Sequence, residues 1–276
     1  MVQAPANFKA LQINADDFAQ SEAIDAAIIN LVNQRIISST SALVLSPRWP
    51  QAAKQLLDLP LQVGLHLDLT SHFTKNFGCY YSLPKLIFLA YSRQLNSQAL
   101  EKVIELQWNA FVDAFGRPPD FIDGHQHVHQ LPVVRDALFS IIVKKSWGLQ
   151  KKNWLRSCQT NHFRDFKTAT ISMLGAQYFR KKAQQLGINT NSDFAGVYNF
   201  NAHANLKKMW ANWLTDLTGD TPLVMCHVAV EDNSNSASNS VDAIYSARVS
   251  EYNWLMSDDF RQLLHSKNLF VARITL

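Results

Sequence analysis

Residues 121–132 form the sequence Phe-Ile-Asp-Gly-His-Gln-His-Val-His-Gln-Leu-Pro, the densest run of ionisable side chains in the chain. An apolar lead-in and a closing Leu-Pro are typical of a strand that feeds a loop. Because side chains alternate along a strand, an extended conformation predicts that four ionisable groups share one face: Asp123, His125, His127 and His129. Such a face is costly to bury without partners, and imidazole is the commonest metal ligand. The run therefore favours a metal site over a hydrogen-bonded polar patch.

Two other strand patterns end in groups of the same kind. Residues 11–14 alternate like a strand and lead to Asp16 and Asp17, and residues 63–70 place His66 and Asp68 on the face opposite three leucines. Active sites of α/β folds lie at the carboxyl ends of parallel strands. We expect one of the adjacent aspartates to bind metal and the other to accept a proton, with His66 as a further ligand. The competing structural interpretations are a helix-capping aspartate and a buried core histidine.

Strand and helix patterns alternate along the whole chain. Further strands are expected at residues 41–44, 154–156, 194–200, 223–230 and 269–276, and helices at 21–31, 104–115 and 133–145. Repeated β-then-α order implies a mainly parallel sheet, and seven or eight strands suggest an α/β barrel. The long segments 71–97 and 158–193 are expected to shape a substrate site, and residues 231–240 to form a loop.

Composition is compatible with one domain spanning residues 1–276. The chain has 47% hydrophobic residues, a net charge of +4 and three cysteines. Dispersed basic residues disfavour nucleic acid as a partner, and few, widely spaced cysteines suit a reducing compartment. Neither a secretory signal nor a membrane span is expected, so a cytoplasmic location is predicted. The sequence is compatible with a homodimer and does not fix the oligomeric state.

Two further features bear on a binding site. Residues 223–227 form an apolar run that ends in His227, which could act as an acid or base across a barrel mouth or could be a core histidine. Segment 71–97 is rich in aromatic side chains, which often provide platforms for sugar rings. We expect at least one of Phe77, Tyr80 and Tyr81 to line a cleft, although these rings could equally fill a small core under the loop.

Five segments, in order along the chain, resemble the YdjC-like carbohydrate deacetylases, which include chito-oligosaccharide and hopanoid-pathway deacetylases. They are residues 13–18, 37–44, 64–66, 123–129 and 225–227. The resemblance implies a distorted, incomplete (β/α) barrel with a divalent metal, Mg²⁺ in this family. This chain departs from the family pattern in two places, with Ala19 where Gly is usual and Val228 where Pro is common. These differences leave the subfamily and the substrate open.

Carried over by position, the resemblance assigns roles to individual residues. It implies metal ligation by Asp17, His66 and His125, a catalytic base at Asp16 and a catalytic histidine at His227. We further expect six residues to contact substrate or support the ligands: Asp123, His127, His129, Arg156, Tyr80 and Tyr81.

The expected reaction is hydrolysis of an N-acetylated sugar by a metal-activated water. Two imidazoles and one carboxylate leave coordination positions open, and this donor set suits Zn²⁺, Fe²⁺, Ni²⁺ or Mn²⁺ better than Mg²⁺. An Fe(II) oxygenase would use the same triad but favours a different fold. A metal-dependent phosphoesterase or amidohydrolase barrel could use His127 and His129 as a ligand pair. A non-catalytic sugar-binding protein would need no proton acceptor, so metal-dependent turnover distinguishes it from an enzyme.

Overall fold

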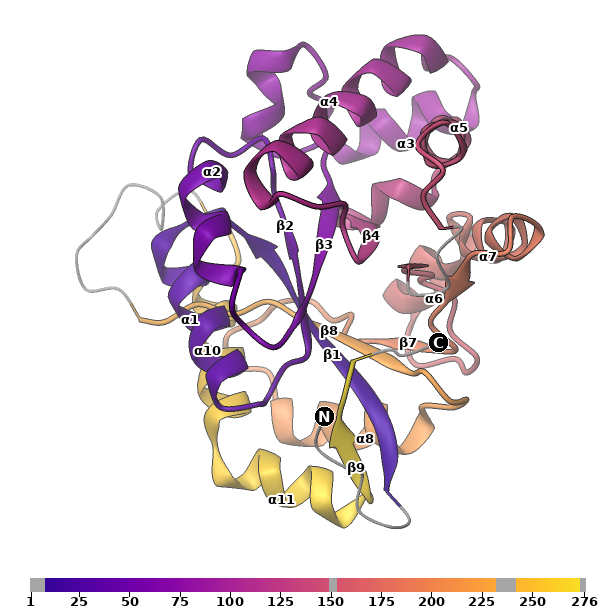
Figure 1. Cartoon of the computed structure of the whole chain (residues 1–276). Helices are drawn as coiled ribbons and strands as arrows, with labels where there is room; N and C mark the ends of the chain where they lie inside the picture. Colours follow the sequence, from indigo (N-terminus) through magenta and orange to yellow (C-terminus); the bar gives the residue numbers. More distant parts are fainter. Residues whose placement is uncertain (1–7, 149–152, 232–241, 274–276) are drawn as a thin grey trace.

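A single curved sheet of parallel strands forms the centre of the computed structural model, which describes residues 8–148, 153–231 and 242–273 (Figure 1). The strand order is β6-β5-β4-β3-β2-β1-β8-β7, with β9 pairing with the start of β1. The strands are β1 (Lys9–Phe18), β2 (Ser39–Ala42), β3 (Gln62–Leu67), β4 (Phe121–Gly124), β5 (Trp154–Leu155), β6 (Asn189–Thr190), β7 (Phe194–Ala195), β8 (Leu223–Cys226) and β9 (Leu269–Val271).

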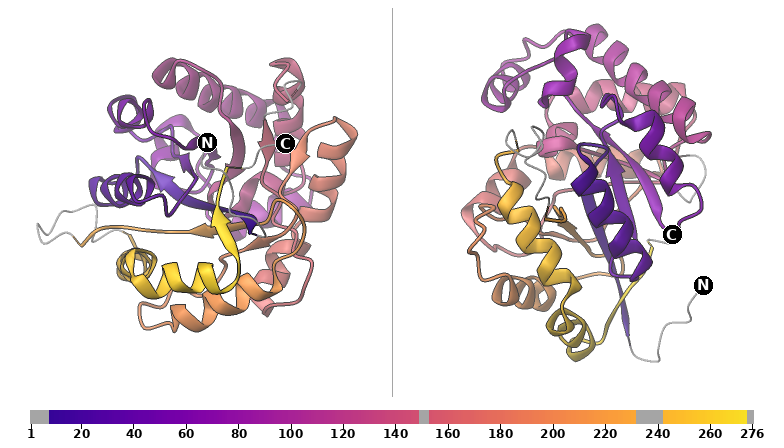
Figure 2. Two further views of the ribbon diagram at one scale, coloured as in Figure 1. Left: turned by 60° about the horizontal axis from the view of Figure 1, so that its bottom comes forward. Right: turned by 90° about the vertical axis from the view of Figure 1, so that its left-hand side faces the viewer.

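Helices cover the outer face of this sheet (Figure 2), and the large apolar core lies between the two layers. The α-helices are α1 (Glu22–Asn33), α2 (Trp49–Ala52), α3 (Leu83–Tyr91), α4 (Ser97–Phe115), α5 (Val134–Lys144), α6 (Phe166–Met173), α7 (Ala176–Gln185), α8 (Leu206–Asp216), α10 (Tyr245–Met256) and α11 (Asp258–Ser266). The short 3₁₀ helices of the described residues are η1 (Ala53–Leu56), η2 (His72–Phe77) and η3 (His125–Gln130). The helices predicted at 21–31, 104–115 and 133–145 are confirmed as α1, α4 and α5. Ser21 caps α1, and Gly116, at φ 76°, ends α4. Within the described ranges, none of the helices is long and apolar enough to cross a membrane.

The sheet curls into a barrel that does not close. Within the described residues no strand pairing joins β6 to β7, although only residues 191–193 separate them. Asn191 bridges part of this opening, because its amide donates to the Ser157 and Asp193 carbonyls, at 2.9 Å each, and accepts from the Ser157 N–H at 2.7 Å. The predicted incomplete α/β barrel is thereby confirmed. The short strand β6 was not predicted, because its two residues, Asn189 and Thr190, are polar and show no strand pattern.

Side chains along β1 alternate between the apolar core and the interior of the barrel. Leu11, Ile13 and Ala15 belong to the apolar core beneath the helices. Gln12 and Asn14 face the other way and hydrogen-bond to side chains of neighbouring strands, with Ser39 at 2.8 Å and Ser41 at 3.3 Å. The next residue on this inner face is Asp16. The strand therefore delivers a carboxylate into the interior of the barrel at its carboxyl end.

The expectation that the histidine run is extended is wrong. Strand β4 stops at Gly124 and the chain turns into η3, with positive φ at Gln126 (51°) and His127 (61°). Gly124 permits this turn, because a Cβ there would lie 2.8 Å from the Nδ1 of His129, which folds back over it. The ionisable groups of the run consequently point to different places. The expected loop at 231–240 and the end of the last strand fall largely outside the described residues.

Candidate metal and active site

Two adjacent aspartates at the end of β1 both line the main cavity. In a regular strand neighbouring side chains point to opposite faces. Asp17 has φ 71°, in the left-handed region, and this break in the alternation lets both carboxylates reach the same site. Asp16 and Asp17 are 2% and 1% exposed, so each needs partners inside the protein.

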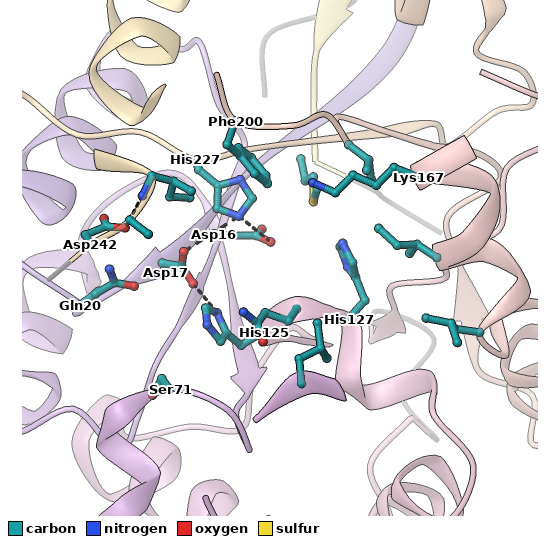
Figure 3. A pocket seen from close by; sticks show the side chains of 18 of the residues that line it. Asp16, Asp17, Gln20, Ser71, His125, His127, Lys167, Phe200, His227 and Asp242 are labelled. Atoms are coloured by element: carbon teal, nitrogen blue, oxygen red, sulfur yellow. Dashed lines mark hydrogen bonds and ion pairs between the residues drawn. The ribbon is translucent and has the colours of Figure 1, made fainter. Parts of the chain in front are cut away.

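Asp17, His66 and His125, which the family resemblance implies as metal ligands, lie close together in the structure. The Oδ1 atom of Asp17 lies 3.3 Å from Nε2 of His66 and 2.9 Å from Nδ1 of His125. One ligand atom from each residue lies within 4.8 Å of the others, a spacing that can hold a metal ion. Figure 3 shows Asp17 and His125 linked across the floor of the cavity. The three residues come from β1, β3 and the first position of η3.

His66 is held from behind by Asp123. Its Nδ1 lies 2.7 Å from Oδ1 of Asp123, so its Nε2 is left to face Asp17. A carboxylate bound to one nitrogen fixes the tautomer and direction of a metal-binding imidazole. Burial favours neutral imidazole, but the negative charge of Asp123 and hydrogen bonds to Asp123 and Asp17 prevail and raise the pKa of His66 to about 10.

A second group, Asp16, His66 and Asp123, also has ligand spacing. Arg156 already pairs with both carboxylates of this group, since its guanidinium binds both oxygens of Asp16, at 2.7 and 2.6 Å, and Oδ2 of Asp123 at 2.5 Å. Burial alone would raise the pKa of Asp16, but the Arg156 charge holds it well below its usual range. The Asp17 cluster is therefore the better candidate for a cation, and Asp16 is an ionised carboxylate beside it.

His227 follows β8 and faces both aspartates (Figure 3). Its Nε2 lies 4.0 Å from Asp16 and 3.9 Å from Asp17, and the edge of its ring contacts Phe200, with the centroids 4.8 Å apart. Burial, together with the nearby positive charge of Arg248, lowers the pKa of His227 to about 4 despite the two carboxylates. The imidazole is neutral at physiological pH in this arrangement.

The two remaining histidines of the run differ in their surroundings. His129 is fully buried, and its Nε2 lies 2.9 Å from the Arg156 carbonyl, so it supports the segment that carries Arg156. His127 lines the cavity, with Nδ1 3.4 Å from Sγ of Cys158. The two do not form a pair directed at one ligand.

The cavity above this cluster has a volume of about 1050 Å³. Segment 71–97 forms part of its wall, as expected, through η2 and α3, but not with the expected aromatics. Phe77, Tyr80 and Tyr81 are absent from the described lining. Tyr80 is 45% exposed beside Lys75, and Tyr81 packs on the main core. The residues that this segment does contribute are Ser71, His72, Phe73, Leu83 and Ile87.

Several residues of the site carried no signal in the sequence. Arg248 of α10 donates from Nη2 to Oδ2 of Asp17 at 2.7 Å and from Nε to Asp242 at 2.6 Å. Glu251, one turn later, accepts the main-chain N–H of His227 at 3.2 Å. Arg248 and Asp17 are 231 positions apart. Only the tertiary fold relates them, so no local pattern could have identified them.

Comparisons with known proteins agree with this architecture. The chain is 30% identical over 199 residues to a chitooligosaccharide deacetylase of Yersinia enterocolitica, a match covering 66% of this chain and 79% of the relative. It is 31% identical over 160 residues to one from Enterobacter sp. (strain 638), where the match covers 56% of this chain and 62%, less than two thirds, of the relative.

Two solved structures share the fold. A protein of Enterococcus faecalis V583, provisionally described as a cellobiose-phosphate cleavage protein, superposes with a TM-score of 0.73 at 21% identity, covering 96% of this chain and 97% of that one. The Bc1960 peptidoglycan N-acetylglucosamine deacetylase gives a TM-score of 0.51 at 11% identity, covering 98% and 88%. The family described as YdjC-like protein matches residues 10–266, and the chain therefore belongs to the YdjC-like family.

Proposed function

We propose that this protein is a metal-dependent hydrolase that removes acetyl groups from N-acetylated sugars or oligosaccharides. The observation that carries the proposal is the meeting of Asp17, His66 and His125 beside a second carboxylate, Asp16, on the floor of a large cavity. The names of the chitooligosaccharide deacetylase relatives support an N-acetylated sugar as the substrate class.

The residues present fit a divalent cation. One carboxylate and two imidazoles match a three-ligand catalytic site that leaves further positions open. Arg248 occupies Oδ2 of Asp17, which leaves Oδ1 to face the two histidines. A bound divalent ion supplies Lewis acidity, which polarises an acyl carbonyl and acidifies water. Mg²⁺ follows from the family resemblance, whereas two imidazole donors favour Zn²⁺ over Mg²⁺.

Amide hydrolysis requires two proton transfers, and Asp16 and His227 are placed to carry them out. Asp16, ionised and held in place by Arg156, accepts the proton of the attacking water. As the carbonyl carbon bonds to the water oxygen and the C–N bond breaks, the departing amine nitrogen takes up a proton. His227, whose Nε2 lies 4.0 Å from Asp16, is placed to relay that proton or to donate a hydrogen bond to the developing oxyanion.

The test combines metal content with acetate release. Protein stripped with a chelator and reloaded with Mg²⁺, Mn²⁺ or Zn²⁺ is assayed on N-acetylglucosamine oligomers of increasing length. We expect metal-dependent acetate release, loss of both metal and activity in His66→Ala, and retention of both in Tyr80→Ala, a matched control outside the cavity. Phosphate release from phosphate esters without acetate release would indicate a phosphoesterase. Oligomer binding by metal-loaded protein without turnover would indicate a sugar-binding protein.

A further inference from the structure

Helix α10 directs two buried ionisable side chains toward the site from one face. Arg248 and Glu251 are three residues apart, so they are neighbours on the helix surface, and each is 2% exposed. Arg248 binds Asp17, and Glu251 binds the main chain of His227. One helix thus contacts both a proposed metal ligand and the proposed catalytic histidine.

The ring of His227 has few restraints of its own. Among the described residues its Nδ1 has no hydrogen-bond partner. Its Nε2 is 3.9–4.0 Å from the two aspartates, beyond hydrogen-bond distance. The direction of the imidazole therefore depends on the backbone at position 227 and on packing against the ring.

Glu251 supplies the backbone restraint. The pairing of β8 with β1 ends at the Ala15–Cys226 pair, so the N–H of the next residue, His227, has left the ladder. An N–H that is shielded from water and lacks an acceptor is unfavourable, and Oε2 of Glu251 accepts this part-buried one at 3.2 Å.

The same carboxylate is tied to the packing around the ring. Its Oε1 accepts the Tyr198 hydroxyl at 2.8 Å. The Tyr198 ring contacts Phe200 with centroids 4.7 Å apart, and Phe200 meets the His227 ring edge-on at 81°. Glu251 is therefore connected to His227 in two ways: directly to the main chain of His227, and to its ring through the side chains of Tyr198 and Phe200.

We propose that Glu251 is a positioning residue for His227, with Tyr198 as its partner, and that α10 thereby sets the distance of the imidazole from Asp16 and Asp17. This inference rests on the proposed function, in which His227 faces the reacting amide. Loss of the restraint lets the imidazole leave its place while the metal ligands stay.

Kinetics of four variants test this role. Glu251→Ala should lower kcat about tenfold to a hundredfold, the loss expected from a misplaced catalytic group. Its KM and its metal affinity, measured by calorimetry, should stay within about twofold of wild type, since no substrate or metal contact is removed. Glu251→Gln keeps an acceptor for the N–H and should restore most of kcat. Tyr198→Phe should lower kcat about fivefold. The control variant Asn253→Ala, at an exposed position of α10, should have the kcat of wild type.

A double variant separates a positioning role from a general one. In a His227→Ala background, Glu251→Ala should cause no further loss of kcat, because both changes act through the same imidazole. The inference is overturned if the double variant shows the product of the two single kcat losses. It is also overturned if Glu251→Ala folds and has the kcat of wild type. If Glu251→Ala does not fold, Tyr198→Phe decides: a lower kcat at constant KM supports the role, and an unchanged kcat overturns it.

NMR of the ¹⁵N-labelled His227 ring keeps the inference testable apart from the proposed function. One imidazole environment is expected in wild type and Glu251→Gln, and several or broadened environments in Glu251→Ala. Unchanged ring signals in Glu251→Ala overturn the positioning role whether or not the wild type releases acetate. Absence of acetate release with every metal overturns the proposed function alone.

Discussion

Asp16 and Asp17 are neighbours in the sequence but have different partners. Both carboxylate oxygens of Asp16 accept hydrogen bonds from Arg156. In Asp17, Oδ2 binds Arg248 and Oδ1 faces the two histidines. The positive φ of Asp17 makes this division possible by turning both side chains into one cavity. The proposed proton acceptor and the proposed metal ligand therefore differ in their partners and not in residue type.

Asparagine substitutions should separate the two roles. Asp16→Asn keeps the metal cluster and removes the base, so metal content should be that of wild type while turnover falls by about 10² or more. Asp17→Asn removes a charged ligand, and we expect metal content and activity to fall together. Elemental analysis and acetate release measure both quantities. Loss of metal in Asp16→Asn with retention in Asp17→Asn would reverse the assignment.

The raised pKa of His66 couples metal binding to pH. In the metal-free protein its pKa, about 10, exceeds the unfolded value of about 6.5. The protonated ring therefore stabilises the metal-free fold fully below pH ~6.5, and this contribution is lost as pH rises through ~10. A metal ion must displace the Nε2 proton, so affinity should rise with pH across this window.

Calorimetry at pH 8 in two buffers of different ionisation enthalpy measures this proton release. We expect the observed heat of metal binding to differ between the buffers by an amount corresponding to about one proton. The same heat in both buffers contradicts a protonated His66, and His66→Ala serves as the control that binds no metal at this cluster.

At the scale of elements, alternation along the sequence predicted strands well and turns poorly. The alternation expected for residues 11–14 is present in β1, where Asn14 and Asp16 share the inner face, because that segment is regular up to Asp16. The same alternation fails after Gly124, where positive φ angles at Gln126 and His127 end the strand. Hydrophobic alternation carries no information about φ, so the strand that leads into the histidine run was predictable and the geometry of the run was not.

Two aromatic residues of the segment that contains η2 and α3 allow a test of substrate contact, because one of them lines the cavity and the other serves as a control. Phe73 lines the cavity, whereas Tyr80, from the same segment, is exposed outside its lining. Phe73→Ala should raise KM for longer oligosaccharides by about five- to tenfold, the loss expected for one aromatic contact. Metal content should not change.

Tyr80→Ala should leave KM unchanged for every chain length. An equal rise in KM for short and long substrates in Phe73→Ala, accompanied by a lower melting temperature, would place the Phe73 ring in the core instead.

In the whole molecule, the site is where otherwise separate elements converge. Its groups come from β1, β3, η3, β8 and α10, so each depends on the curvature of the open barrel. The sequence predicts those that follow strands, because parallel strands present their carboxyl ends at one edge. Arg248 and Glu251 come instead from a helix late in the chain, and their contribution depends on how that helix packs.

Convergence also predicts that the metal stabilises the fold as a whole. Asp17, His66 and His125 are far apart in the unfolded chain and come together only in the native barrel. A ligand that binds only the native state at a hundred times its Kd adds about 2.7 kcal/mol to the free energy of unfolding. For a chain of this size each kcal/mol raises Tm by about 2–4 °C, so a rise of roughly 5–10 °C is expected.

Thermal unfolding of chelator-treated protein, with and without added Mn²⁺ or Zn²⁺, measures this rise. Tyr80→Ala should show it in full, because that side chain lies outside the cavity, and His66→Ala should show almost none. His66→Ala also loses the Asp123 partner and should start from a lower Tm, so the comparison is between the metal-induced shifts and not between the absolute values. A shift of equal size in His66→Ala would locate the stabilising ion elsewhere and would leave Asp17, His66 and His125 without their proposed role.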